Sequence, residues 1–264
     1  MMRKTLTTLQ GMREKNEKIA MLTCYDSSFA TLLENNGVDV LLIGDSLGMV
    51  LQGRASTLAV TIDTMAYHTA CVASGSTQAF IIADMPFGTS QISPRETFAH
   101  AACLMSAGAH MVKIEGGEVM AETIAFLTGR GIPVCAHLGL TPQSVHQLGG
   151  YRVQGKSDQA AQRLLREADI VAQAGAGMVL LEAVPAALTT EISALLHVPT
   201  IGIGAGANCS GQVLVLHDML DIYPGKKARF VKNFMQGATS IGEAVANYVR
   251  DVKSGTFPAK EHSF

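Results

Sequence analysis

The segment AHMVKIEGG, residues 109–117, decides the fold, because an apolar run ends here at charged groups and two glycines follow at once. Four other apolar runs also end at an ionisable residue: VDVLLIGD (38–45), QAFIIADMP (78–86), IPVCAHLG (132–139) and GMVLLEAVP (177–185). Short apolar runs of this kind are typical of strands that are buried on both faces, and such strands occur in parallel sheets covered by helices.

Helix-like segments lie between these runs. The clearest is residues 93–108, with Ser93 as N-cap, Pro94 at the first helical position and Gly108 as its stop. Eight strands that alternate with helices over about 250 residues favour a closed (β/α)8 barrel, or TIM barrel. We expect residues 1–264 to form it as a single domain. The remaining expectations are strands at 18–26, 198–206 and 211–220, a long loop at 141–157, a closing helix over 230–255 and an exposed tail at 257–264.

The composition argues against several classes of protein. A net charge of −2 over 264 residues gives no electrostatic reason to expect nucleic acid or an anionic membrane as a partner. The five cysteines are widely spaced and form no C-x-x-C pair, which predicts reduced thiols in a cytoplasmic protein. The N-terminal segment lacks the apolar region of a signal peptide, and no apolar run approaches the roughly 18 residues of a membrane span.

A parallel barrel brings the carboxyl ends of its strands to one mouth, where such enzymes bind and convert their substrates. The residues that end the five apolar runs should therefore meet there: Asp45, Asp84, Lys113, Glu115, His137 and Glu182. Asp45 and Asp84 follow neighbouring strands, and two adjacent carboxylates suit a hard cation such as Mg²⁺ between them. The alternative is that each Asp caps the turn or helix that follows it.

The other strand-end residues also allow two interpretations each. Lys113 and Glu115 lie two apart on one strand, so they share a face and form an internal ion pair, a ligand site or both. Glu182 lies in apolar surroundings that disfavour its charged form, which makes it a candidate general base or a paired structural residue. His137 ends an apolar strand, and a lone histidine in that position is more often a satisfied core residue than part of a site.

Several segments resemble the ketopantoate hydroxymethyltransferase family over nearly the whole chain, from about residue 4 to 264. They are LIGDSLGMVLQG (42–53), ADMPFGTS (83–90), MVKIEGG (111–117), VCAHLGLTPQSVHQLGGYRVQG (134–155), LLEAVP (180–185), IGIGAG (201–206) and PAKEHSF (258–264). The resemblance implies a (β/α)8 barrel of the phosphoenolpyruvate mutase and isocitrate lyase group.

The resemblance further implies an activity and its site. The family transfers a hydroxymethyl group from 5,10-methylenetetrahydrofolate to 3-methyl-2-oxobutanoate, the first committed step of pantothenate synthesis, with one Mg²⁺ per subunit. It implies that Glu182 is the catalytic base and that the metal is held by Asp45, Asp84 and Glu115. The substrate is expected to contact Asp45, Ser46, Asp84, Lys113 and His137. A homo-oligomer, the family's decamer, is expected as well.

Two other functions compete with this one. A Mg²⁺-dependent lyase of the related barrel group is disfavoured, because the sequence has no reactive cysteine in a K-K-C-G-H-like context. A non-catalytic metabolite-binding barrel does not explain why a base, a carboxylate pair and a lysine all lie at strand ends.

Overall fold

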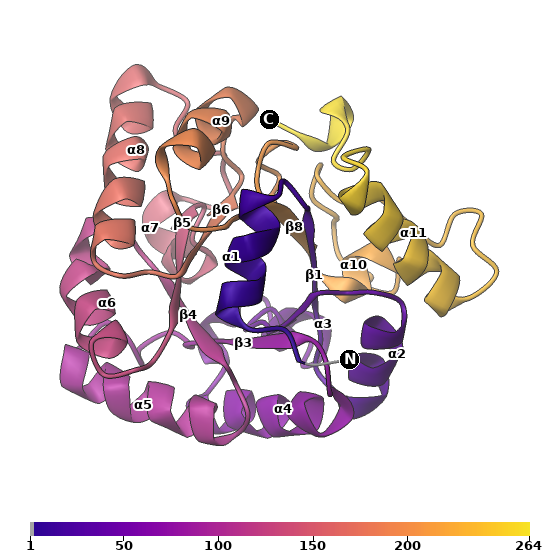
Figure 1. The fold of residues 1–264 in the computed structure, drawn as a ribbon, viewed down its shortest axis with the longest axis horizontal. Helices are drawn as coiled ribbons and strands as arrows, with labels where there is room; N and C mark the ends of the chain where they lie inside the picture. Colours follow the sequence, from indigo (N-terminus) through magenta and orange to yellow (C-terminus); the bar gives the residue numbers. More distant parts are fainter. Residues whose placement is uncertain (1–2) are drawn as a thin grey trace.

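Eight parallel strands form a closed barrel in the computed structural model, which describes residues 3–264 (Figure 1). The strands follow one another around the barrel in chain order, and β8 pairs with β1 to close it. This confirms the predicted (β/α)8 barrel. The strands are β1 (Ile19–Thr23), β2 (Val40–Ile43), β3 (Phe80–Asp84), β4 (Met111–Glu115), β5 (Val134–Gly139), β6 (Met178–Glu182), β7 (Thr200–Ile203) and β8 (Gly211–Leu214).

Helices surround the barrel, and neighbouring ones pack on each other in the order α11, α2, α4, α5, α6, α8 and α9 (Figure 1). The predicted start of α5 is confirmed, since the Ser93 hydroxyl accepts a hydrogen bond from the backbone N–H of Glu96 and Pro94 is the first helical residue. The helices are α1 (Leu6–Glu14), α2 (Ser27–Asn35), α3 (Leu47–Val50), α4 (Ile62–Gly75), α5 (Pro94–Ser106), α6 (Ala121–Thr128), α7 (Val145–Leu148), α8 (Asp158–Gln173), α9 (Ala186–Leu195), α10 (Leu216–Met219) and α11 (Ile241–Lys253).

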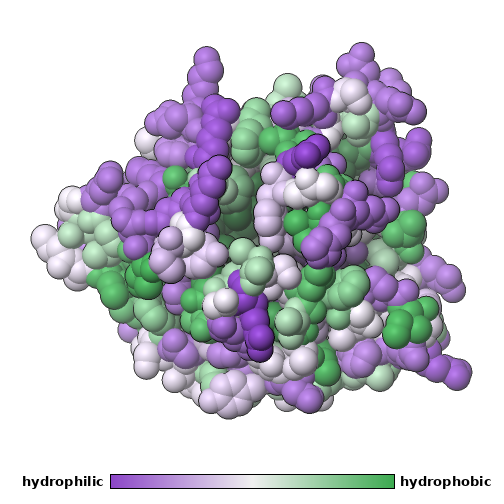
Figure 2. All heavy atoms as spheres, turned by 180° about the vertical axis from the view of Figure 1, so that it is seen from behind, coloured by the Kyte–Doolittle hydropathy of each residue, from purple (hydrophilic) through white to green (hydrophobic). Residues whose placement is uncertain are grey.

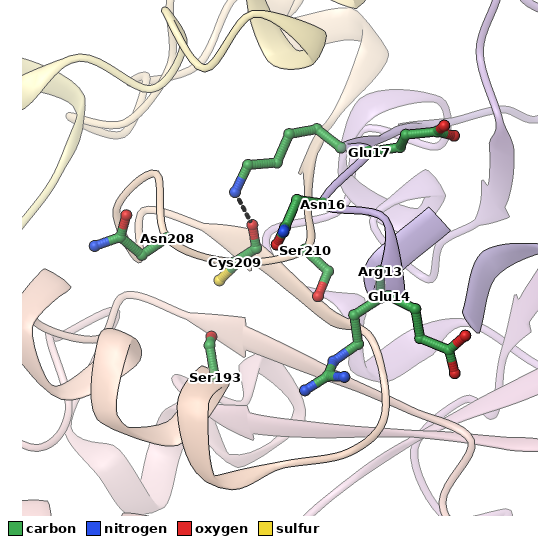
Figure 3. A pocket seen from close by; sticks show the side chains of 9 residues that line it. Arg13, Glu14, Asn16, Glu17, Ser193, Asn208, Cys209 and Ser210 are labelled. Atoms are coloured by element: carbon green, nitrogen blue, oxygen red, sulfur yellow. Dashed lines mark hydrogen bonds between the residues drawn. The ribbon is translucent and has the colours of Figure 1, made fainter. Parts of the chain in front are cut away.

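The connection between β7 and β8 differs from the others, because residues 204–210 return to the start of β8 without a helix. The Lys18 ammonium supports this short crossover by donating hydrogen bonds to the carbonyl oxygens of Ala207, at 3.0 Å, and Cys209, at 2.5 Å. Figure 3 shows Asn208, Cys209 and Ser210 of this crossover. A small cavity of about 290 Å³ lies beside these residues, between them and the segment that follows α1. Lys18 and Ser210 precede β1 and β8, so this cavity is at the amino ends of the strands, away from the predicted site.

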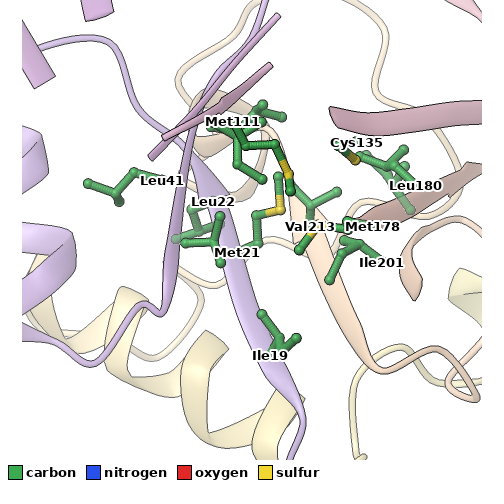
Figure 4. Packing of buried hydrophobic residues seen from close by; sticks show 14 of the residues in the cluster. Ile19, Met21, Leu22, Leu41, Met111, Cys135, Met178, Leu180, Ile201 and Val213 are labelled. Atoms are coloured by element: carbon green, nitrogen blue, oxygen red, sulfur yellow. The ribbon is translucent and has the colours of Figure 1, made fainter. Parts of the chain in front are cut away.

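The barrel interior is filled by alternate residues of the strands. Met21, Met111, Met178 and Val213 gather between the strands in Figure 4, and the register places Met21 level with Val213. Leu22, next to Met21, points to the opposite side of its strand, as the two-residue period of a strand requires. Each such buried side chain contributes roughly 1.5–3 kcal/mol relative to leaving it exposed. The outer surface is mixed, and Figure 2 shows one face with a hollow whose interior is hydrophobic and whose edges are hydrophilic.

Helix α11 covers the seam where the barrel closes. The buried Tyr248 hydroxyl lies 2.8 Å from the carbonyl oxygen of Met21 on β1 and 2.9 Å from that of Gln212 on β8. One side chain of α11 therefore contacts the backbone of both strands that form the seam.

The predicted eighth strand is too long. Residues 211–220 divide into β8, which ends at Leu214, and α10, which begins at Leu216. The backbone N–H of Leu216 donates a hydrogen bond of 2.9 Å to the Thr23 hydroxyl of β1, and this side-chain contact replaces strand pairing.

The predicted closing helix and the exposed tail also need correction. The helix occupies only Ile241–Lys253, because Phe234 packs edge-on against Tyr248 and Phe257 instead of continuing a helix. In the tail, Phe257 is buried and the carbonyl oxygen of Phe264 accepts a hydrogen bond of 2.8 Å from the N–H of Ala186. The tail is therefore docked on the barrel. The loop at 141–157 contains the short helices η3 (Pro142–Ser144) and α7.

None of the helices in the described part of the chain has the length and hydropathy that crossing a lipid bilayer requires.

Candidate active site

The structure brings the six predicted strand-end residues together at one mouth of the barrel. The β-sheet register places Asp84 level with Lys113, Glu115 level with His137, and Gly139 level with Glu182. Asp45 follows β2 by two residues, as the chain turns through Gly44 into α3. Five of the six residues are buried, and the side chain of Glu182 retains 15% exposure.

Asp84 anchors the loop that carries Asp45. The Oδ2 atom of Asp84 accepts a hydrogen bond of 3.0 Å from the backbone N–H of Asp45. Neither carboxylate caps the helix that follows it, because α3 has no side-chain cap and α5 is capped by Ser93. The capping alternative is therefore not what the structure shows.

Lys113 links Asp84 to His137. Its ammonium lies 3.1 Å from Asp84 Oδ1 and 3.0 Å from His137 Nδ1. Burial alone would lower the pKa of Lys113, but the carboxylates of Asp84, Glu115 and Asp45 outweigh it and raise that pKa. An ammonium only donates hydrogen bonds, so His137 Nδ1 is the acceptor and the imidazole carries its proton on Nε2.

His137 in turn contacts Glu182, the candidate base. Its Nε2 atom lies 3.2 Å from Glu182 Oε2. Burial, together with the charge of Lys113, lowers the pKa of His137, so the ring is neutral at pH 7. The chain Asp84–Lys113–His137–Glu182 therefore crosses β3 to β6 and ends at the one carboxylate of the cluster with appreciable exposure to the cavity.

The sequence analysis missed Gln143, which connects two of the carboxylates. Its backbone N–H donates to Glu115 Oε2 at 2.9 Å, and its side-chain amide donates to Asp45 Oδ2 and to the carbonyl oxygen of Met85, both at 2.9 Å. The residue lies in η3, within the segment predicted only as a loop, and is buried. A buried amide between two carboxylates has no periodic pattern by which the sequence could reveal it.

Ser46 lies at the cavity beside a second missed residue, Tyr25. The two hydroxyl oxygens are 2.9 Å apart. Burial raises the pKa of Tyr25, so its phenol stays protonated and can donate to Ser46. When Tyr25 is the donor, the Ser46 hydroxyl proton is available for a bound ligand.

The charge balance of the cluster fits a cation. Burial, followed by repulsion from Asp84 and Glu115, raises the pKa of Asp45, and burial raises that of Glu115 to about 7. Glu115 Oε1 is buried without a hydrogen-bond partner, and Asp84 Oδ1 is buried with the Lys113 ammonium as its ion-pair partner. Three carboxylates facing one lysine and a neutral histidine are thus short of positive charge.

The geometry limits how many protein ligands such a cation has. Within residues 3–264, no three His, Cys, Asp or Glu side chains converge closely enough to surround an ion. Mg²⁺ typically takes one or two carboxylates and completes its octahedron with water and substrate oxygens, which this donor set allows.

A cavity of about 700 Å³ extends outward from the cluster. Besides the strand-end residues, it is lined by apolar and aromatic side chains, including Tyr151, Tyr223, Phe230 and Phe264. Its volume is within the range of about 300–1,000 Å³ that holds drug-sized ligands. The docked tail, predicted as exposed, thus contributes to the wall of this cavity.

Comparisons with known proteins identify the family of the chain. The family model of ketopantoate hydroxymethyltransferase matches residues 3–260. A protein of Nitrosospira multiformis named 3-methyl-2-oxobutanoate hydroxymethyltransferase is 66% identical over 263 residues, covering 100% of both chains. A protein of the same name from an Azoarcus species is 65% identical, over 98% of this chain and 96% of its own.

Solved structures with much lower sequence identity share the fold. The structure of 2,3-dimethylmalate lyase, a member of the phosphoenolpyruvate mutase and isocitrate lyase superfamily, aligns with a TM-score of 0.59 at 18% identity, over 81% of each chain. This likeness shows that the two proteins share the barrel fold. With the match of the family model over almost its whole length, the chain belongs to the ketopantoate hydroxymethyltransferase family.

Proposed function

We propose that this protein transfers a hydroxymethyl group from 5,10-methylenetetrahydrofolate to 3-methyl-2-oxobutanoate, giving ketopantoate and tetrahydrofolate. The observation that carries the proposal is the 66% identity, over the full length of both chains, to a relative named for this reaction. The buried carboxylates, lysine and histidine at the barrel mouth support it, because the reaction needs a stabilised enolate and a base.

The cluster divides into a part for charge and a part for proton transfer. Asp45 and Asp84 would hold the Mg²⁺, with Glu115 beside them either in direct contact or through water. The bound ion supplies a Lewis acid that stabilises negative charge developing on the oxo acid. Lys113 and Ser46 donate hydrogen bonds to the carboxylate and keto oxygens of the substrate.

Proton removal from C3 of the oxo acid falls to Glu182. Its carboxylate lines the cavity, and its Oε2 atom is 3.2 Å from His137 Nε2. The proton on Nε2 orients the glutamate, and His137 itself is held by Lys113. Water hydrolyses the methylene bridge of the folate beside C3, so that both bridging nitrogens regain a hydrogen and the carbon is released as formaldehyde. The carbanion equivalent adds to that carbon, and the alkoxide that forms takes up a proton to complete the hydroxymethyl group.

The test is formation of ketopantoate by the purified protein. It should require 3-methyl-2-oxobutanoate, 5,10-methylenetetrahydrofolate and Mg²⁺ together, and EDTA should stop it. Product formed equally fast without folate, or with excess EDTA, would contradict the proposed donor or the proposed metal.

A homodecameric assembly, the single-domain organisation of residues 1–264 and a cytoplasmic location remain part of this proposal. A phosphonopyruvate hydrolase and a 2,3-dimethylmalate lyase share the fold at 13% and 18% identity, and a likeness at this level supports no second activity here.

A further inference from the structure

The outer end of the active-site cavity carries positive charge that the proposed chemistry does not use. Four cations line it: Arg152, Lys226, Lys227 and Arg229, here called the basic rim. Arg152, Lys226 and Arg229 are exposed and Lys227 is half-buried, whereas Asp84 and Lys113 of the strand-end cluster are 2% and 4% exposed. The cavity therefore runs from a buried acidic end to an exposed basic end.

The basic rim retains a surplus of positive charge. Lys227 forms an ion pair with Asp221, and Asp218 is the one carboxylate outside the strand-end cluster among the cavity-lining residues of the described chain. Four cations thus face two carboxylates. Arg229 is held in place by the docked tail, because its Nε donates a hydrogen bond of 3.0 Å to the carbonyl oxygen of Glu261 and its guanidinium lies 5.6 Å from the Phe264 ring centre.

The cavity is also larger than a small branched 2-oxo acid requires. At about 700 Å³ it has room for a second, drug-sized molecule beyond the strand-end cluster. Its walls also include Tyr151, Tyr223 and Phe230, flat side chains on which an aromatic ring can stack.

The reaction fixes the direction in which the folate enters. Its methylene carbon must reach C3 of the oxo acid, which is bound at the acidic end beside Glu182. The ring that carries this carbon therefore points inward, and the benzoyl-glutamate half extends toward the mouth. The glutamate carries carboxylates, which would be repelled by the acidic end and attracted by the basic rim.

We infer that the basic rim is the binding subsite for the glutamate carboxylates of the folate co-substrate. This inference rests on the proposed function, since it takes the folate as donor. Because Lys226 and Lys227 are close to solvent, their contribution is expected mainly in folate affinity and in its dependence on salt.

The experiment compares two ligands and two double variants. Binding of tetrahydrofolate and of tetrahydropteroate, the fragment that lacks glutamate, is measured by titration calorimetry with the oxo acid and Mg²⁺ present. The variant Lys226→Ala/Lys227→Ala removes two rim cations. Its matched control, Lys15→Ala/Arg166→Ala, removes two exposed cations outside the cavity, one after α1 and one on α8.

The wild-type protein and the control should bind tetrahydrofolate about five- to thirtyfold more tightly than tetrahydropteroate, and the rim variant should lose most of this difference. In turnover, the rim variant should raise KM for the folate by a similar factor and leave KM for the oxo acid unchanged. Raising the salt concentration should weaken folate binding by the wild type more than by the rim variant. Lys226→Glu/Lys227→Glu should have a larger effect in the same direction.

Equal binding of the two ligands by the wild type, or an unchanged preference in the rim variant, would overturn the inference. Failure of the proposed function gives a different result, because the wild type would then form no ketopantoate at any folate concentration. Circular dichroism and the KM for the oxo acid show whether the variant is folded.

Discussion

The side-chain amide of Gln143 donates a hydrogen bond of 2.9 Å to Oδ2 of Asp45, a residue 98 positions earlier in the chain. The backbone N–H of the same residue is bonded to Glu115, so the loop after β5 fixes carboxylates that follow β2 and end β4. Gln143 thereby occupies one oxygen of each carboxylate and leaves the other oxygen free. Its hydrogen bonds also lower the free-energy cost of burying Asp45 and Glu115 together.

Replacing Gln143 by Leu should therefore weaken the metal site without removing any proposed ligand. Loss of a residue that orients ligands commonly costs 10- to 100-fold in metal affinity, so the Mg²⁺ concentration for half-maximal activity should rise by at least about tenfold. Stability should fall by about 1–3 kcal/mol, because Asp45 Oδ2 and the Met85 carbonyl lose their donor. Gln147→Leu, at an exposed position of α7, is the matched control. An unchanged Mg²⁺ requirement in Gln143→Leu would show that the amide serves stability alone.

Asp84 is expected to be needed for both activity and stability. Asp84→Ala leaves the Lys113 ammonium buried without its nearest carboxylate, which typically costs about 3–5 kcal/mol. Urea unfolding of Asp84→Ala and of Asp84→Ala/Lys113→Met measures this coupling. The double variant should regain much of the stability and none of the turnover. If the double variant is no more stable than the single one, the ion pair is not what makes Asp84→Ala unstable.

Glu182 is predicted to remove the C3 proton before carbon transfer. The wild type should exchange the C3 hydrogen of 3-methyl-2-oxobutanoate with solvent deuterium in the presence of Mg²⁺, even without folate. Glu182→Gln keeps the shape and removes the basicity, so exchange and kcat should fall together, by about 10²- to 10⁴-fold. Nuclear magnetic resonance follows the exchange, and Glu191→Gln, exposed on α9, serves as control. Exchange at the wild-type rate in folded Glu182→Gln would exclude this residue as the base.

Acid should remove a stabilising contribution made by Glu34. Partial burial would raise its pKa, but the Ser76 hydroxyl and the backbone N–H groups of residues 77–79 donate to the carboxylate and lower that pKa to about 2. A lowered pKa in the folded state means that the contribution is complete above about 4.5, the value of the free side chain, and is lost as the pH falls toward 2.

Glu34→Gln should accordingly lower the free energy of unfolding by about 1–2 kcal/mol at pH 7. Urea unfolding at pH 7 and at pH 3 should show a smaller difference between variant and wild type at the lower pH. A difference that stays constant between these pH values would mean that the carboxylate charge is not involved.

The assembly is predicted to be a homodecamer. Tyr67, Ile92 and Val119 are large apolar side chains with 68%, 71% and 85% exposure, more than solvent contact favours. Sedimentation equilibrium should give ten times the chain mass of 27.8 kDa. A particle of the single-chain mass at micromolar concentration would contradict the prediction.

The positions of the strand-end residues could be predicted from the sequence because strand burial and strand ends are local properties. The run that ends at Lys113 and Glu115 is apolar in sequence for the same reason that it is buried in the barrel. The contacts between the strand-end residues could not be predicted from local sequence, because Lys113 reaches His137 only through the register of β4 and β5.

The parts that the sequence did not reveal depend on contacts between distant segments. The end of β8 is fixed by Thr23, a residue near the other end of the chain, whose hydroxyl accepts a hydrogen bond from Leu216. Phe264 reaches the cavity only because the tail docks at Ala186. Phe234 fits the apolar spacing of a helix, but in the structure it packs against Tyr248 outside any helix. The apolar pattern alone does not distinguish these two environments.

The contact of Tyr248 with both Met21 and Gln212 has a consequence for synthesis of the chain on the ribosome. Strand β1 is among the first segments to emerge, yet its partner β8 and the helix that covers their seam come more than 180 residues later. Until then β1 has one unpaired edge, the kind of surface on which strands of other chains can add. We therefore expect the nascent chain to be most prone to aggregation in this interval, before β8 pairs with β1.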